Sequence, residues 1–142
     1  MTENRLQAAK NAIDLGIVVG DIDASLHFYV EVLGLELVEK LDIPWGTMHR
    51  LRFGESWIKL LAATRDGLTA GPVGIDAGLG LRYFTMEIHG IEAAWDRLTA
   101  AGVEVYRPLG PFGDKGLVVA MVLDPDGNVV ELVHRPPSAR VG

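Results

Sequence analysis

The sequence predicts an α+β protein built from two copies of one β-α-β-β-β unit. Three observations predict this fold class. Each half of the chain has a strand pattern followed by a helix pattern, a glycine follows each helix, and further strand patterns come after that glycine. The same order of elements found twice is stronger evidence for a fold than any single motif.

The first unit is predicted over residues 12–63. Ile13–Val19 is rich in β-branched residues, which favour strands, and Asp21 can cap the helix that follows. Gly34 stands at the position where a helix commonly ends. The apolar face of that helix has the spacing i, i+3, i+4 and i+7, at Leu26, Tyr29, Val30 and Leu33. Three more strands are predicted at Leu35–Leu41, Thr47–Phe53 and Trp57–Ala62.

The second unit is predicted over residues 81–135. It begins with a strand at Leu81–Ile88, and Gly102 closes its helix as Gly34 closes the first. The helix has the same apolar spacing, at Ile91, Ala94, Trp95 and Leu98. A strand at Val103–Tyr106 follows. The unit ends in a hairpin whose turn, Asp124–Asn128, contains proline and glycine between Leu117–Leu123 and Val129–Val133.

The remaining segments connect or flank these units. Residues 64–80 are predicted as a linker, because Arg65–Gly80 holds five glycines and a proline without apolar periodicity. Residues 1–11 are expected to be a polar leader and residues 136–142 a tail. The length of 142 residues suits one compact domain or two small fused modules.

Composition excludes several classes of function. Hydrophobic residues make up 49% and charged residues 23%, as in ordinary globular proteins. The net charge of −6 argues against nucleic-acid and anionic-membrane partners. The chain has no cysteine, which excludes disulfides, thiolate metal sites and a cysteine nucleophile. No apolar run approaches 18 residues, and a cytoplasmic location is expected by default.

One acidic residue does not fit its surroundings. Glu131 lies inside the apolar strand Val129–Val133, where a carboxylate loses hydration unless it has a partner or a wet cavity. On the hairpin alone, an edge strand with Glu131 facing solvent is the simpler interpretation. Longer motifs favour a cavity. They are VVGDIDASLHFYVEVLGLEL, AAWDRLTAAGVEV and DPDGNVVELVH.

These motifs resemble the vicinal oxygen chelate superfamily, which includes glyoxalase I, bleomycin-resistance proteins and extradiol dioxygenases. The resemblance covers roughly residues 12–135. It implies two paired βαβββ modules that form a curved mixed sheet around one cavity, with the helices on the convex side. It also implies a small-molecule substrate or ligand and a homodimer. The superfamily hosts many chemistries, so the fold does not fix the function.

The resemblance marks four cavity positions where metal-using members place their ligands: Asp14, Lys59, Tyr83 and Glu131. A protonated Lys59 has no lone pair to donate, and Tyr83 is a poor ligand near neutral pH. The four histidines show no ligand spacing. The sequence therefore predicts neither a metal nor another cofactor. Each of the four also has a structural alternative, and together they can form a salt-bridged plug in a vacated metal site.

Neighbouring strand positions extend this candidate site. Trp57 shares a strand face with Lys59, and Thr85 shares one with Tyr83. Arg50 and Arg52 face the cavity if their apolar neighbours face the helices, and otherwise they are rim charges. These four residues are the expected substrate-binding set. The segment Arg107–Gly116 is interpreted as a lid or as a plain surface loop.

Two functions are expected from different classes. The first is a metal-independent isomerase, lyase or cyclase that works by acid–base chemistry through an enolate-like intermediate. In it Lys59 and Tyr83 donate protons or stabilise an oxyanion, and Glu131 or Asp14 acts as the base. The alternative is a bleomycin-resistance-like protein that binds or sequesters a small molecule without turnover.

Overall fold

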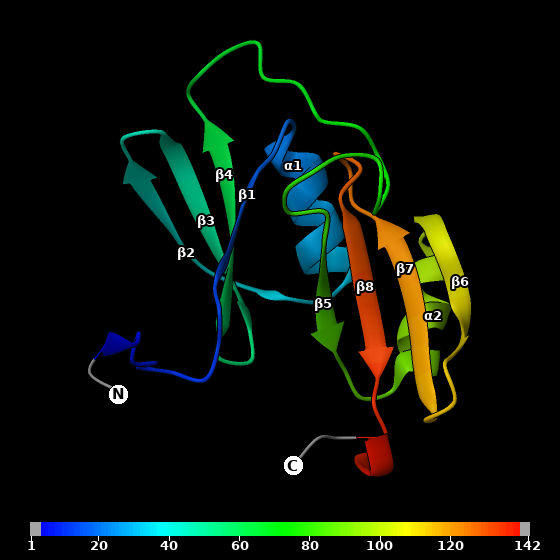
Figure 1. The fold of residues 1–142 in the computed structure, drawn as a ribbon. Coiled ribbons are helices and arrows are strands. Elements are labelled where there is room, and N and C mark those ends of the chain that lie inside the picture. The colour runs from blue at the N-terminus through cyan, green and yellow to red at the C-terminus, as the bar shows by residue number, and fades with distance from the viewer. Residues whose placement is uncertain (1–3, 140–142) are drawn as a thin grey trace.

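The computed structural model describes residues 4–139 and contains two four-stranded mixed sheets (Figure 1). The first three residues of the expected leader and the last three of the expected tail lie outside the described residues. In the first half the elements are β1 (Leu15–Val18), α1 (Ile22–Leu26), the π-helical segment η2 (His27–Val32), β2 (Glu36–Ile43), β3 (Gly46–Phe53) and β4 (Ser56–Ala63).

The second half repeats this order. Its elements are β5 (Tyr83–Glu87), α2 (Ile91–Ala100), β6 (Glu104–Phe112), β7 (Leu117–Leu123), β8 (Val129–His134) and a short 3₁₀ turn, η3 (Pro137–Ala139). The sheet orders are β1-β4-β3-β2 and β5-β8-β7-β6, and in each the first pair is parallel and the others antiparallel. The α+β class and the duplicated unit are confirmed. Among the described residues, no helix is both long and apolar enough to cross a membrane.

The two halves share one hydrophobic core. Phe28 and Tyr29 of η2 are buried in a cluster that includes Leu60 of the first sheet and Leu132 of the second. Apolar burial of this kind is the main favourable contribution to folding. The helices therefore pack on one face of each sheet and leave the other face of each sheet for other contacts.

A buried hydrogen-bond network also joins the halves. Tyr29 donates its hydroxyl to Asp124 Oδ2 at 2.7 Å, across 95 positions of the chain. Asp124 is only 4% exposed, and it also accepts from the backbone N–H groups of Asp126 and Asn128 and from the Asn128 side chain. Burial, followed by the charge of Asp124, raises the pKa of Tyr29, so its hydroxyl stays protonated as the donor. The network fixes the turn between β7 and β8.

The helix of the first unit differs from the regular α-helix that its apolar spacing predicts. After Leu26 the backbone widens into η2, and the Leu33 N–H donates to the Phe28 carbonyl, five residues earlier. Tyr29 and Val30 still face the core, because both positions belong to the cluster of the two halves. Nothing in the apolar pattern distinguishes the two kinds of helix.

The expected lid at Arg107–Gly116 is wrong for most of its length. β6 continues through Phe112, which leaves only the turn 113–116 outside the strands. β6 is an edge strand, where proline is tolerated because one side of the strand needs no ladder donors. A register shift between Arg107 and Gly110 spans Pro108, whereas Pro111 pairs with Val118 in regular register. A proline-rich stretch was therefore mistaken for a loop.

The segment between β4 and β5 has no helix or strand in the structure. It crosses from the first sheet to the second and folds back before β5 (Figure 1). Ile75 packs against a cluster on the second sheet that contains Val119 and Val133, and its N–H donates to the Tyr106 hydroxyl at 3.1 Å. This connecting segment therefore covers part of the second sheet and helps to shape a cavity.

Candidate functional site

The first sheet separates its apolar and charged side chains between its two faces. On β3, His49 and Leu51 are buried, and His49 Nδ1 lies 3.3 Å from the Leu60 carbonyl oxygen. Because strand residues alternate between faces, Arg50 and Arg52 lie on the opposite, open face. The arginines therefore meet the condition set for facing a cavity, and His49 does not.

Both arginines are held against Trp57 of the neighbouring strand. The guanidinium carbon of Arg50 lies 3.9 Å from the ring centroid of Trp57, and that of Arg52 lies 4.6 Å from it. Arg50 also pairs with Glu39, and Arg52 pairs with Glu36 at 3.5 Å. Cation–π contact and the ion pairs orient these guanidinium groups. Arg50 and Arg52, which are expected substrate-binding residues, therefore contact Trp57, which is another.

Lys59 lies beside this cluster. It is opposite Arg50 on one side and opposite Gly16 on the other in the strand register. A side chain at Gly16 would meet nothing within 4 Å, so the space next to Lys59 is open. Among the described residues, Lys59 makes no hydrogen bond or ion pair. We call Arg50, Arg52, Trp57 and Lys59 the basic face.

Asp14 has contacts of its own at the edge of this face. Its Oδ1 accepts from Lys10 Nζ at 2.6 Å and from the Trp57 backbone N–H at 2.8 Å. The bond from Lys10, followed by that from Trp57, lowers the pKa of Asp14, and the charge of Lys59 adds a smaller effect. The carboxylate thus caps strand backbone, which is the structural alternative weighed for this residue.

The second sheet carries the other two predicted positions. Thr85 and Glu131 are opposite each other in the register, and the Thr85 hydroxyl donates to Glu131 Oε1 at 2.5 Å. Tyr83, two residues before Thr85, is 50% exposed. Within residues 4–139, no hydrogen bond or ion pair joins Tyr83 or Glu131 to Asp14 or Lys59. A single cavity shared by all four stays a prediction.

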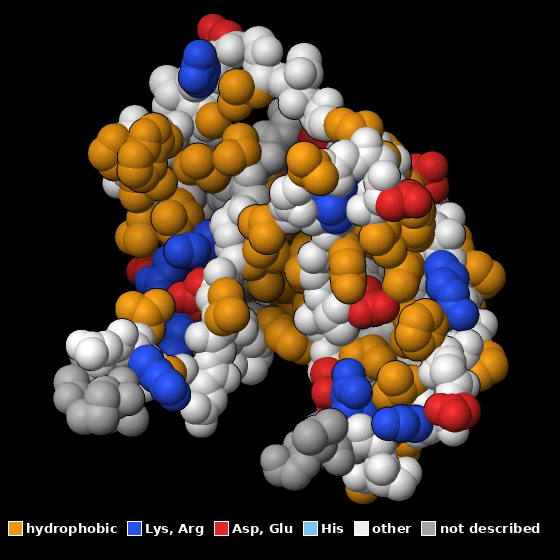
Figure 2. Space-filling view, in the orientation of Figure 1, with side chains coloured by type: hydrophobic (Ala, Val, Ile, Leu, Met, Phe, Trp, Pro, Cys, Tyr) orange, Lys and Arg blue, Asp and Glu red, His pale blue; other side chains and the backbone are white. Residues whose placement is uncertain are grey.

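The surface above the basic face is apolar. Figure 2 shows hydrophobic side chains gathered over the upper part of the first sheet, with charged side chains below them. A groove of about 430 Å³ in this region is lined by Val18, Trp45, Leu61 and Leu68, among others. Trp45 is 71% exposed. Exposed apolar patches of this kind commonly mark interaction surfaces.

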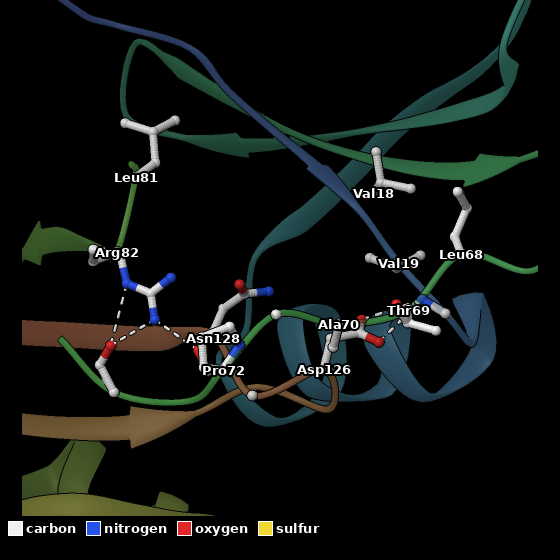
Figure 3. Close-up of a pocket in the computed structure, with 14 residues that line it drawn as sticks. Val18, Val19, Leu68, Thr69, Ala70, Pro72, Leu81, Arg82, Asp126 and Asn128 are labelled. Atoms are coloured by element: carbon white, nitrogen blue, oxygen red, sulfur yellow. Dashed lines mark hydrogen bonds between the residues drawn. The ribbon is translucent and has the colours of Figure 1, made fainter. Parts of the chain in front are cut away.

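A separate cavity of about 420 Å³ lies where the end of β1, the connecting segment and the β7–β8 turn meet (Figure 3). None of the four predicted positions lines it. Its charged residues are Arg82 and Asp126, which sequence reasoning did not select. Asp126 was placed in a turn by its Pro and Gly neighbours, but nothing in the pattern showed that Arg82 would face it.

The side chains of Asp14, Lys59, Tyr83 and Glu131 in one chain do not form a set of ligands that fits a metal ion. No three His, Cys, Asp or Glu side chains among the described residues gather closely enough to hold one. Lys59 and Tyr83 replace two donors, and Asp14 already uses Oδ1 for two hydrogen bonds. His49, the histidine whose facing the sequence left open, is buried on the helix side.

Two β-α-β-β-β units that share one core define a fold of duplicated modules. The chain belongs to the Glyoxalase/Bleomycin resistance protein/Dioxygenase superfamily, whose family model matches residues 12–132. The resemblance inferred from the motifs is confirmed.

Several similar proteins are named as lactoylglutathione lyases. A probable lactoylglutathione lyase of Synechocystis sp. is 34% identical over 121 residues, which cover 83% of this chain and 90% of that protein. Lactoylglutathione lyase GLX1 of Arabidopsis thaliana is 33% identical over 122 residues, 84% of this chain but only 42% of the plant protein. The chain therefore spans less than half of the plant relative.

Solved structures agree with the fold. SMU.1112c superimposes with a TM-score of 0.72 at 26% identity, covering 89% of this chain and 99% of that one. A glyoxalase I mutant from Zea mays gives a TM-score of 0.71 at 25% identity, covering 84% of this chain and 43% of that one. Both contain the duplicated arrangement over most of the present chain.

The relatives correct one expectation. Replacement of two ligands led to the prediction of a metal-independent enzyme, but the relatives are lactoylglutathione lyases, which typically depend on a metal. That prediction is wrong as a conclusion about function. Replacing donors changes a ligand set, but residue types alone do not decide whether the reaction uses a metal.

Proposed function

We propose that the chain is a lyase- or isomerase-type enzyme whose substrate is a small organic anion bound on the basic face. The observation that carries this proposal is the cluster of Arg50, Arg52 and Lys59 around Trp57. The two arginines are oriented by their partners, whereas no hydrogen-bond or ion-pair partner of Lys59 is found among the described residues. An anionic substrate would supply the missing partner of Lys59. The names of the relatives support the reaction class.

Residues of the second sheet are proposed to handle protons. Thr85 donates to one oxygen of Glu131, which orients the carboxylate and leaves Oε2 without a hydrogen bond among the described residues. Oε2 can then accept a proton from a substrate carbon or hydroxyl. We propose that Tyr83, half exposed on the neighbouring strand, returns a proton or stabilises a developing oxyanion. Asp14 acts through Trp57 by fixing the strand edge.

The test uses lactoylglutathione, the compound in the relatives' names. We expect the purified protein to catalyse the lyase reaction, in which the C–S bond of lactoylglutathione breaks without water and gives glutathione and methylglyoxal. A carbonyl trap that consumes the methylglyoxal drives the reaction, which is followed by loss of the thioester's ultraviolet absorbance in parallel assays with and without added Zn²⁺, Ni²⁺ or Mn²⁺. The Arg50→Gln, Arg52→Gln double variant should raise KM by about a hundredfold, since two charge-assisted contacts are lost. Arg97→Gln on α2 is the matched control. Binding without cleavage in every arm would contradict the enzyme proposal and favour sequestration.

We also propose that the chain forms a homodimer through the apolar groove beside the basic face. Trp45 is the most exposed aromatic side chain of this surface, and aromatic residues are enriched in the buried centres of interfaces. Trp45→Glu should therefore shift the mass measured by light scattering from dimer to monomer. Leu79→Glu, at an even more exposed apolar side chain on the connecting segment, should leave the mass unchanged. A monomeric parent would refute the dimer. A cytoplasmic location stays a prediction.

A further inference from the structure

The cavity in Figure 3 has a charged group of each sign facing it. Its walls come from Val18–Gly20 at the end of β1, from the connecting segment, and from the β7–β8 turn. Arg82 lies at one end of the cavity and Asp126 at the other (Figure 3). With a volume of about 420 Å³, the cavity is large enough for a small ligand.

Arg82 is oriented without being neutralised. Its Nε donates to the Gly74 carbonyl at 3.2 Å, and its Nη2 donates to the carbonyls of Pro72 and Gly74 at 2.6 and 2.7 Å. These bonds fix the guanidinium plane against the backbone of the connecting segment. Nη1 makes no hydrogen bond, and no carboxylate pairs with Arg82 among the described residues. Its charge is therefore available to an anionic group.

Asp126 supplies the negative charge that faces the cavity. Its two carboxylate oxygens accept from the single Gly20 N–H at 3.1 and 3.3 Å. A side chain on Gly20 would approach Asp126 Oδ1 to 2.9 Å, so the carboxylate would have to shift. Its charged neighbours are Asp124 and Asp21, of the same sign, and no cation in the described part of the chain pairs with it. Asp126 therefore lacks a positive partner.

Apolar side chains and polar groups both form the remaining walls of the cavity. Leu81 lies on the Arg82 side of the cavity, and Val18 and Leu68 lie on the Asp126 side (Figure 3). A ligand that matches these walls carries a carboxylate at one end, an ammonium at the other, and apolar groups between them. An α-amino acid places both charges on one carbon and does not separate them in this way. A dipeptide does.

We propose that this cavity binds a dipeptide-sized zwitterion with apolar side chains, its carboxylate on Arg82 and its ammonium on Asp126. The site lies apart from the basic face and shares no residue with it. The cavity is bounded by both halves of the chain and by the segment that connects them. A ligand bound there would hold the connecting segment against the β7–β8 turn.

The probe is leucyl-leucine, titrated by isothermal calorimetry. Two analogues each remove one charge: the C-terminal amide lacks the carboxylate, and the N-acetyl form lacks the ammonium. We expect each analogue to bind the parent protein about tenfold more weakly, the effect of one charge-assisted contact. Amide chemical shifts of Gly20, Gly71 and Gly127, which line the cavity, should move on titration.

Variants test whether the ammonium group of the ligand binds to Asp126. Asp126→Asn retains an oxygen for the Gly20 N–H and removes the negative charge, so it should abolish the preference for leucyl-leucine over its N-acetyl form. Asp96→Asn, on the exposed side of α2, and Lys59→Met, on the basic face, should keep that preference. No saturable binding of leucyl-leucine, or equal binding of all three compounds by the parent, would overturn the proposal. Loss of the preference in Lys59→Met would place the ligand on the basic face instead.

Discussion

Asp124→Ala is expected to lower the free energy of unfolding by about 3–5 kcal/mol, measured by urea denaturation at neutral pH. The carboxylate accepts four hydrogen bonds while almost completely buried. Alanine leaves the hydroxyl of Tyr29 and two backbone N–H groups without partners, and unpaired buried donors are costly. The turn before β8 would lose its main support.

Two further variants separate the network from a general loss of packing. Tyr29→Phe removes one hydroxyl and keeps the ring, so its cost should be smaller, about 1–2 kcal/mol. Asp96→Ala, an exposed carboxylate on α2, should change stability by less than about 0.5 kcal/mol. If Asp124→Ala is no more destabilising than Asp96→Ala, the turn is held by its proline and glycine alone.

The sequence predicted the order of the elements because each of them has a local pattern. Alternating and apolar runs, glycines after both helices and the Asp124–Asn128 turn are all visible within short windows. The register that places Thr85 opposite Glu131 then follows from the parallel pairing of β5 with β8. One short window does not establish the fold. The same order of elements in the second unit supported the elements predicted for the first.

Contacts between the halves could not be predicted in the same way. Tyr29 was placed on an apolar helix face, but its hydroxyl partner is 95 residues away. The connecting segment was recognised only as a segment without periodicity, so neither the packing of Ile75 nor the bonds from Arg82 to its carbonyls could be anticipated. Such contacts depend on how the two units meet.

The candidate site could also be predicted only in part. Alternation on β3 correctly tied the facing of Arg50 and Arg52 to that of their apolar neighbours, and the buried Leu51 satisfies that condition. The hydrogen bond from the Trp57 backbone to Asp14 depends on the parallel pairing of two strands that are far apart in the sequence. The prediction of a metal-independent enzyme was wrong for another reason. It was drawn from the residue types at four positions, and these do not determine the reaction.

Lys59→Met is expected to reduce substrate affinity or turnover by roughly 30- to 700-fold, or about 2–4 kcal/mol, the scale of one lost oxyanion donor. Lys59 lies opposite Arg50 with open space beside it at Gly16, and no carboxylate within residues 4–139 lies at hydrogen-bond distance from it. A substrate anion on the basic face would therefore meet an ammonium group that no internal ion pair competes for. Methionine keeps most of the unbranched side chain and removes the ammonium group.

The same variant should fold as the parent does, because Lys59 makes no hydrogen bond that the fold requires. Urea denaturation of both proteins checks this before kinetics are compared. Lys40→Met is the matched control, since Lys40 is an exposed lysine of the same sheet, paired with His49 and so directed to the opposite face. If the Lys59→Met variant binds and cleaves lactoylglutathione no less efficiently than the Lys40→Met variant does, Lys59 is only a surface charge. A loss confined to Lys59→Met would instead place the substrate anion on the basic face, because the two substitutions differ only in which face of the sheet loses its charge.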